Sequence, residues 1–230
     1  MLSARELNSE SLPNRTWINE HLTFTHGYGI TLGPVNEVTT EGLPILFVKD
    51  IPPESSVPSI DVKEPSIYFG ELTNNYVLVN TNAKEFHYSK AEGEENVETV
   101  YSGADGVRIG GLGRRLLFSV GFQSLQILFS NDITADSRVL YHRNITDRVT
   151  TIAPFLRYDK DPYLVVDDRG HLVYIQDAYT ISDHFPHSTW FNTLELASES
   201  GFNGDDLNYL RNSVKVVMDA YDGTMTFYVA

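Results

Sequence analysis

Apolar and polar residues alternate most regularly near the C-terminus, in the segment from Val214 to Val229. Asp222 and Gly223 interrupt the alternation, and an Asp-Gly pair favours a two-residue turn between antiparallel strands. The pattern therefore predicts a hairpin with one buried face and one polar face. We expect the buried face to consist of Val216, Met218, Phe227 and Val229.

Two other hairpins are predicted upstream. The segments Ser66 to Leu72 and Tyr76 to Thr81 are apolar and joined by three polar residues, which favours a hairpin. Tyr163 to Asp177 predicts another, turning at Asp168 to Gly170. Its strands are apolar on both faces, so we expect it to lie deeper in the fold than the C-terminal hairpin.

Helical periodicity is confined to the middle of the chain. After a strand and the Gly110–Gly113 turn, we expect helices over Arg114 to Phe129, Asp136 to His142 and Thr146 to Ala153. The first has apolar residues around most of its circumference and so has to be covered on several sides. The sequence predicts one α+β domain over residues 1–230, with antiparallel hairpins and a helical segment (about 113–153) packed on the sheet.

Composition narrows the classes of function. Of the 230 residues 41% are hydrophobic, which is enough for a packed core. The net charge of −14 argues against nucleic acid as a partner, because phosphate binding needs clustered cations. With no cysteine there is no disulfide and no thiolate metal site. No apolar run reaches the roughly 20 residues of a transmembrane helix, so we expect the chain taken alone to be soluble.

Arginine is concentrated in the middle of this acidic chain. Residues 108–157 contain seven arginines, three aspartates and no lysine, a local net charge of +4. Arginine binds carboxylates and phosphates in a bidentate manner. We favour internal pairing with the acidic flanks, and an anionic partner is the alternative. The candidates for such a partner surface are Arg114, Arg115, Arg138, Arg143 and Arg148.

A metal site is the other chemistry to consider. His184 and His187 have the spacing of metal ligands and Asp183 lies beside them, but Pro186 precludes a regular helix and no third ligand stands out. We therefore expect no metal centre and no cofactor. No nucleophile elbow or zinc-protease helix is present, so no catalytic residue is assigned and a binding role is favoured over an enzyme.

Four longer segments carry a resemblance to a known family. They are NRTWINEHLTFTHGYGITLGPVNE (Asn14 to Glu37), SNDITADSRVLYHRNITDRV (Ser130 to Val149), APFLRYDKDPYLVV (Ala153 to Val166) and LRNSVKVVMDAYDGTMTFYV (Leu210 to Val229). Together they resemble the uncharacterised bacterial protein family UPF0182, and the resemblance extends over nearly the whole chain.

The resemblance implies a location more than an activity. Members of the family are similar in having several N-terminal transmembrane helices followed by a large domain outside the cytoplasm. This chain lacks those helices and stops at Ala230 where members continue, so we expect it to be a soluble part of a longer cell-membrane protein. The implied partners are the remainder of that protein and an envelope component or anionic ligand. The expected role is binding or structural, and a cell-envelope hydrolase, metal-assisted by the histidine pair, is the alternative.

Overall fold

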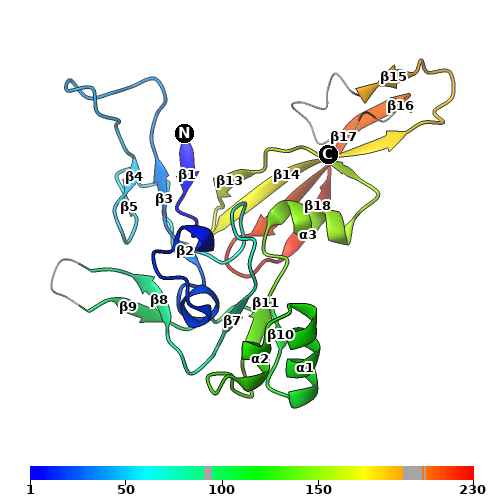
Figure 1. Ribbon diagram of the computed structural model, residues 1–230. Coiled ribbons are helices and arrows are strands. Elements are labelled where there is room, and N and C mark those ends of the chain that lie inside the picture. Colours follow the sequence, from blue (N-terminus) through cyan, green and yellow to red (C-terminus); the bar gives the residue numbers. More distant parts are fainter. Residues whose placement is uncertain (91–94, 194–203, 205) are drawn as a thin grey trace.

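The computed structural model describes residues 1–90, 95–193, 204 and 206–230. The chain is a sheet-rich mixture of antiparallel strands and short helices (Figure 1), which confirms the predicted α+β class. The largest sheet has the order β12–β14–β17–β18, and β13 pairs with another part of β14. Its strands are β12 (Arg157–Tyr158), β13 (Tyr163–Val166), β14 (Leu172–Ser182), β17 (Tyr209–Asp219) and β18 (Met225–Val229).

The β13–β14 hairpin confirms the second upstream prediction. Val166 pairs with Leu172, and the turn between them is closed by a hydrogen bond from the Gly170 N–H to the Asp167 carbonyl, 2.9 Å long. Gly170 has φ +84°, a conformation that glycine adopts without steric cost. β14 is the central strand, with β17 on one side and β12 and β13 on the other. Leu172, Val173 and Tyr174 at its start are all buried, so both faces of the strand are covered there.

The C-terminal hairpin has the predicted faces but a different register. Val216 lies opposite Phe227, two residues away from the pairing that a two-residue turn would impose. The connection is instead a four-residue loop, Ala220–Gly223, closed by a 3.0 Å hydrogen bond from the Asp219 N–H to the Thr224 carbonyl. A shift of two residues keeps every side chain on its predicted face, because the side-chain period of a strand is two.

Burial across this hairpin differs between its strands. Val216 and Met218 on β17 are completely buried, as predicted. Phe227 is 37% exposed and Val229 is 90% exposed, so the prediction that they belong to the core is wrong. The reason is topological: β18 is the edge strand of the sheet, whereas β17 is paired on both sides.

The N-terminal half forms several small antiparallel sheets. One has the order β1–β3–β4–β5, and two others are two-stranded. The strands are β1 (Leu2–Ala4), β3 (Ile30–Leu32), β4 (Val48–Lys49) and β5 (Glu54–Ser55), then β2 (Gly27–Tyr28) with β6 (Ser66–Ile67), and β8 (Glu85–Tyr88) with β9 (Val97–Thr99). A last pair, β15 (Phe191–Asn192) with β16 (Asp206–Leu207), extends from the ends of β14 and β17 (Figure 1).

A three-stranded sheet separates two hydrophobic cores. It consists of β10 (Val107–Arg108), β11 (Arg138–Leu140) and β7 (Val77–Val79), in that order. On β7, Val77 and Val79 pack in the large core with the main sheet, while Leu78 packs in a smaller core with Ile127. Both faces of β7 are thus covered, and this accounts for its uninterrupted Val-Leu-Val sequence.

The predicted long helix is two helices, α1 (Leu112–Gly121) and α2 (Leu125–Phe129). The break lies at Gln123, whose φ of +53° is incompatible with a continuing helix. Gly111 caps α1, and a Cβ on the neighbouring Gly110 would lie 2.5 Å from the Ala135 Cα, so the glycine turn is structural. Figure 1 shows both helices at one end of the molecule, away from the main sheet.

α3 (Ile145–Ile152) confirms the third predicted helix. Asn144 caps it by accepting hydrogen bonds from the backbone N–H groups of Thr146 and Asp147, at 2.9 and 3.3 Å. Ile145 and Val149 place its apolar side in the large core. Two single-turn elements near the N-terminus, Ser9–Ser11 and Asn19–Thr23, complete the helical structure of the described residues.

Two sequence predictions, for residues 66–81 and 136–142, are wrong. Segment 66–81 does not form a hairpin: β6 pairs with β2 and β7 with β11, because Gly70 and Thr73 between them bond to Arg143 and Ile145 instead. Segment 136–142 is strand β11 and not a helix. Its apolar residues Val139 and Leu140 point to opposite cores, and only an extended chain allows adjacent residues to do so.

Candidate functional site

A cluster of polar side chains lies inside the fold around Glu85, which is 2% exposed. Its carboxylate accepts hydrogen bonds from the Thr25 hydroxyl at 2.6 Å, the Tyr68 hydroxyl at 2.8 Å and the Tyr101 backbone N–H at 3.2 Å. Burial raises the pKa of Glu85 and the three donors act in the opposite direction. Glu85 is the acceptor in all three bonds, which is the pattern of an ionised carboxylate.

Arg143 carries the opposite charge and contacts two of the residues that also bond to Glu85. Its guanidinium donates to the backbone carbonyls of Tyr68 (2.6 Å), Thr25 (2.6 Å) and Asn75 (3.1 Å). Thr25 and Tyr68 therefore contact Glu85 through their hydroxyl groups and Arg143 through their main chains. Burial lowers the pKa of Arg143 to about 10, so the side chain remains a cation at neutral pH.

His26 and His87 extend this cluster towards the surface. The single proton of the Thr25 hydroxyl goes to Glu85, so the His26 Nδ1 atom, 2.9 Å from the Thr25 oxygen, has to be the donor in that bond. His26 Nε2 is then an acceptor for His87 Nδ1, 3.0 Å away. Burial, and secondly the neighbouring His87, lowers the pKa of His26 to about 3, so its imidazole is neutral.

We call these six residues the Glu85 cluster: Thr25, His26, Tyr68, Glu85, His87 and Arg143. Because Glu85, His26 and Arg143 are each at most 5% exposed, a ligand in solution has no access to their polar atoms. The polar atoms of these three residues are therefore satisfied by one another's segments inside the fold. Sequence analysis missed it, because its members come from four separate segments.

The five candidate arginines make fewer carboxylate contacts than expected. Of these five, only Arg148 forms an ion pair with a described residue, Asp105, at 2.8 Å. The others donate to main-chain carbonyls: Arg114 to Arg108, Arg115 to Ser130 and Ile133, Arg138 to Ala104 and Asp105, and Arg143 as described. Carbonyls of irregular segments need donors as much as carboxylates do, and a guanidinium with five N–H groups can supply several at once. An anionic partner for these side chains stays a prediction.

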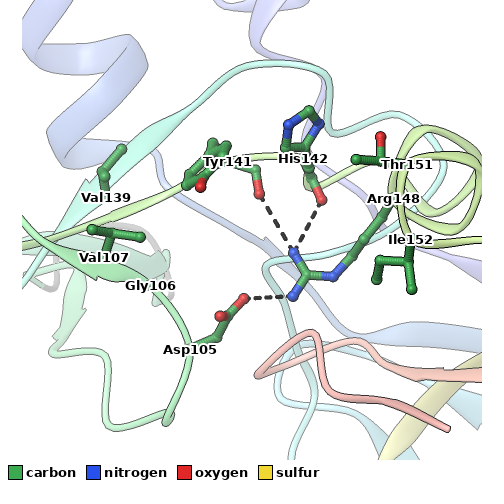
Figure 2. A pocket seen from close by; sticks show the side chains of 9 residues that line it. All are labelled: Asp105, Gly106, Val107, Val139, Tyr141, His142, Arg148, Thr151 and Ile152. Atoms are coloured by element: carbon green, nitrogen blue, oxygen red, sulfur yellow. Dashed lines mark hydrogen bonds and ion pairs between the residues drawn. The ribbon is translucent and has the colours of Figure 1, made fainter. Parts of the chain in front are cut away.

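Arg148 is the candidate arginine that lines a pocket (Figure 2). The guanidinium donates to Asp105 on one side and to the carbonyls of Tyr141 (3.5 Å) and His142 (3.3 Å) on the other, and it lies over the ring of Phe69 at 4.8 Å. These contacts hold it at the edge of a cavity of about 230 Å³. The cavity is lined by Asp105, Gly106, Val107, Val139, Tyr141, His142, Arg148, Thr151 and Ile152.

The outer side of α1 and α2 is the second accessible feature. Its apolar side chains are each between 54% and 75% exposed, whereas the prediction required this helical segment to be covered on several sides. We call this surface the α1–α2 face: Leu112, Leu116, Leu117, Val120, Leu125 and Phe129. Beside Phe129 lies a hollow of about 470 Å³ that is also lined by Trp17 and Ile18.

The candidate metal ligands from the sequence lie in the loop that follows β14, away from the Glu85 cluster and the Arg148 pocket. Asp183 and His184 bond to each other, and both side chains are mostly exposed. His187 has φ +58° in the same loop. Throughout the part of the chain that the structure describes, no group of three His, Asp or Glu side chains is placed to hold a metal ion. The expectation that the protein binds no zinc stays a prediction for elemental analysis.

Comparison with known proteins identifies the family of this chain. None of the described helices is long and apolar enough to span a bilayer, and no solved structure matches the chain. The family model of the uncharacterised protein family UPF0182 matches residues 1–230. UPF0182 proteins from Geobacter sp. (strain M21), Pelobacter propionicus and Sulfurovum sp. are 53%, 50% and 49% identical over all of this chain. The chain spans only 24% of the length of each of these curated relatives. The chain therefore belongs to the UPF0182 family, as a part of a longer protein whose function is unknown.

Proposed function

We propose that this chain is a binding domain of a longer bacterial membrane protein, that it lies outside the cytoplasm, and that its α1–α2 face contacts another part of the same protein. The observation that carries the proposal is the exposure of six large apolar side chains on two adjacent helices. Groups of exposed large apolar side chains are usually covered by a protein or a membrane.

The rest of the polypeptide is the occupant that best fits the surroundings. About three-quarters of the length of the matched relatives lies outside this chain, so a large partner is available in the same molecule. The hollow beside Phe129 can receive a protruding side chain, which a flat lipid surface would leave unfilled. The net charge of −14 also opposes adsorption to an anionic bilayer.

Cross-linking from the α1–α2 face tests this proposal. A photoreactive phenylalanine derivative would replace Leu117, which is 69% exposed, in a family-length protein that carries this sequence at the matching position. The control is the same replacement at Asp168, an exposed turn residue on the main sheet. We expect cross-links from position 117 to residues outside this segment, identified by mass spectrometry, and none from position 168.

Two outcomes would contradict the proposal. Cross-links from position 117 to lipid alone would indicate a membrane-docking surface. Equal cross-linking from positions 117 and 168 would show that the α1–α2 face has no preferred partner within the protein.

A further inference from the structure

The Arg148–Asp105 pair lies between two adjoining hollows. The first is the cavity of about 230 Å³ between β10, β11 and α3 (Figure 2). The second, of about 360 Å³, lies against the loop that joins β17 to β18 and is lined by Asp222, Thr224 and Met225 among others. Asp105, Arg148 and Ile152 line both. We call the two hollows together the Arg148 groove.

The groove presents fixed donors and acceptors. Arg148 is held from behind by Phe69 and from the side by two carbonyls, and 17% of its side chain is exposed. Asp105 is 36% exposed, and only one of its carboxylate oxygens has a hydrogen-bond partner among the described residues. Thr151 lines the first hollow and Thr224 lines the second. A ligand can therefore donate to Asp105 and accept from Arg148 without breaking the ion pair.

The charges of the groove argue against an anionic ligand. Asp105 neutralises Arg148, and Asp222 in the second hollow adds a further negative charge. An anion would have to displace Asp105 from the guanidinium and then lie close to two carboxylates, and like-charge repulsion opposes both steps. A neutral ligand avoids this cost.

The shape and the apolar walls point to a ligand with hydroxyl groups on a compact carbon frame. Val107, Val139 and Ile152 form apolar walls in the first hollow, and Met225 does so in the second. The first hollow is smaller than the roughly 300–1,000 Å³ of pockets for drug-sized ligands, and the second lies at the lower end of that range, so each suits one ring-sized unit. Adjacent sugar hydroxyls both donate and accept, which matches a carboxylate beside a guanidinium.

We propose that the Arg148 groove binds a short neutral glycan, one sugar unit in each hollow, with hydroxyl groups bonded to Asp105 and Arg148. This site is separate from the α1–α2 face, so either proposal can fail without the other. The sugar ring packs its C–H groups on the Val107–Ile152 walls, and the ion pair orients it.

Titration followed by NMR tests the proposal on this chain. The probes are neutral disaccharides of glucose, galactose, mannose and N-acetylglucosamine, with glucuronic acid and citrate as anionic comparisons. We expect at least one neutral disaccharide to bind with a dissociation constant in the millimolar range and to shift amide resonances of Asp105, Gly106, Arg148 and Thr224. Added salt should leave this binding unchanged, because no net charge is exchanged.

Blocking variants make the test specific. Ile152→Trp fills the groove from a position that is 54% exposed, and Thr151→Trp does so from the adjacent exposed residue. Either should weaken binding at least about tenfold, or about 1.4 kcal/mol. Phe155→Trp is the matched control, because residue 155 is 74% exposed and lies outside the groove.

Three results would overturn the proposal. The first is that no neutral disaccharide shifts the groove resonances. The second is that binding survives in whichever blocking variant retains the folded amide spectrum. The third is that only glucuronic acid or citrate binds, in a salt-dependent manner, which would identify an anion site.

Discussion

The Glu85 cluster and the α1–α2 face reverse the usual distribution of side chains. The first places a carboxylate, a guanidinium and an imidazole in the interior, and the second places leucines and a phenylalanine on the surface. Polar groups tolerate burial when each finds a partner, as Glu85 does with its three donors. Apolar groups remain exposed only where no other described element covers them. The polar groups of the Glu85 cluster thus find their partners within this chain, and a partner for the α1–α2 face stays a proposal.

The test of this comparison with the largest expected effect replaces Arg143. Arg143→Met should lower the free energy of unfolding by about 3–5 kcal/mol, because Glu85 would stay buried without its compensating cation and three carbonyls would lose their donor. Urea denaturation at pH 7 measures the effect. Arg114→Met is the control, since that exposed side chain has a single carbonyl partner among the described residues and should cost about 1 kcal/mol or less. A similar cost for both variants would show that Arg143 has no special role.

A second test uses two apolar residues of α2. Ile127 is completely buried in the smaller core and Leu125, two positions earlier, is 67% exposed. Ile127→Ala should cost about 2–5 kcal/mol and Leu125→Ala no more than about 0.5 kcal/mol, by thermal or urea unfolding. Equal costs would mean that the α1–α2 face is already covered within this chain, and the proposed partner surface would not exist.

The smallest expected effect concerns pH. His26 has a pKa of about 3 in the folded protein and about 6.5 when unfolded, so the unfolded state takes up the proton first. The stability linked to His26 is therefore complete above pH 6.5 and declines as the pH falls towards 3, by about 1.4 kcal/mol per pH unit. Between pH 7 and pH 5 this amounts to about 2 kcal/mol.

A variant series isolates this contribution from that of other groups. His26→Gln should lose less stability between pH 7 and pH 5 than the original chain does, in urea titrations at both values. His184→Gln is the matched control, the same replacement at a histidine whose side chain is 86% exposed. If His26→Gln shows the original pH dependence, His26 does not titrate as the structure indicates.

Sequence patterns predicted the elements that depend on neighbouring residues. α3 follows from apolar residues at helical spacing, and the β13–β14 hairpin follows from a turn that ends at Gly170. The faces of β17 were also correct, since alternation alone decides them. The break at Gln123 was missed, because the residue in the left-handed conformation is not itself a glycine, and Gly121 two positions earlier still belongs to α1.

Local sequence patterns did not predict contacts between residues that are far apart in the chain. The hairpin predicted over residues 66–81 failed because Gly70 and Thr73 bond to residues about 70 positions away. The register of β17 and β18 was set by a four-residue loop that the Asp222–Gly223 signal did not distinguish from a two-residue turn. Among the candidate site residues, Arg148 lines an accessible pocket. Its partner Asp105 was not among the residues that the sequence analysis singled out.

The sequence by itself determined the α+β class, the family and several local elements, because periodicity, caps and turn residues act over a few positions. Tertiary structure alone decided which charged groups are buried and which apolar groups are exposed. Thr25, Tyr68, Glu85 and Arg143 meet only when four segments fold together, and each makes burial of the others tolerable. The helices α1 and α2 read as buried because their apolar residues surround the axis, yet no described part of this chain packs on their outer side.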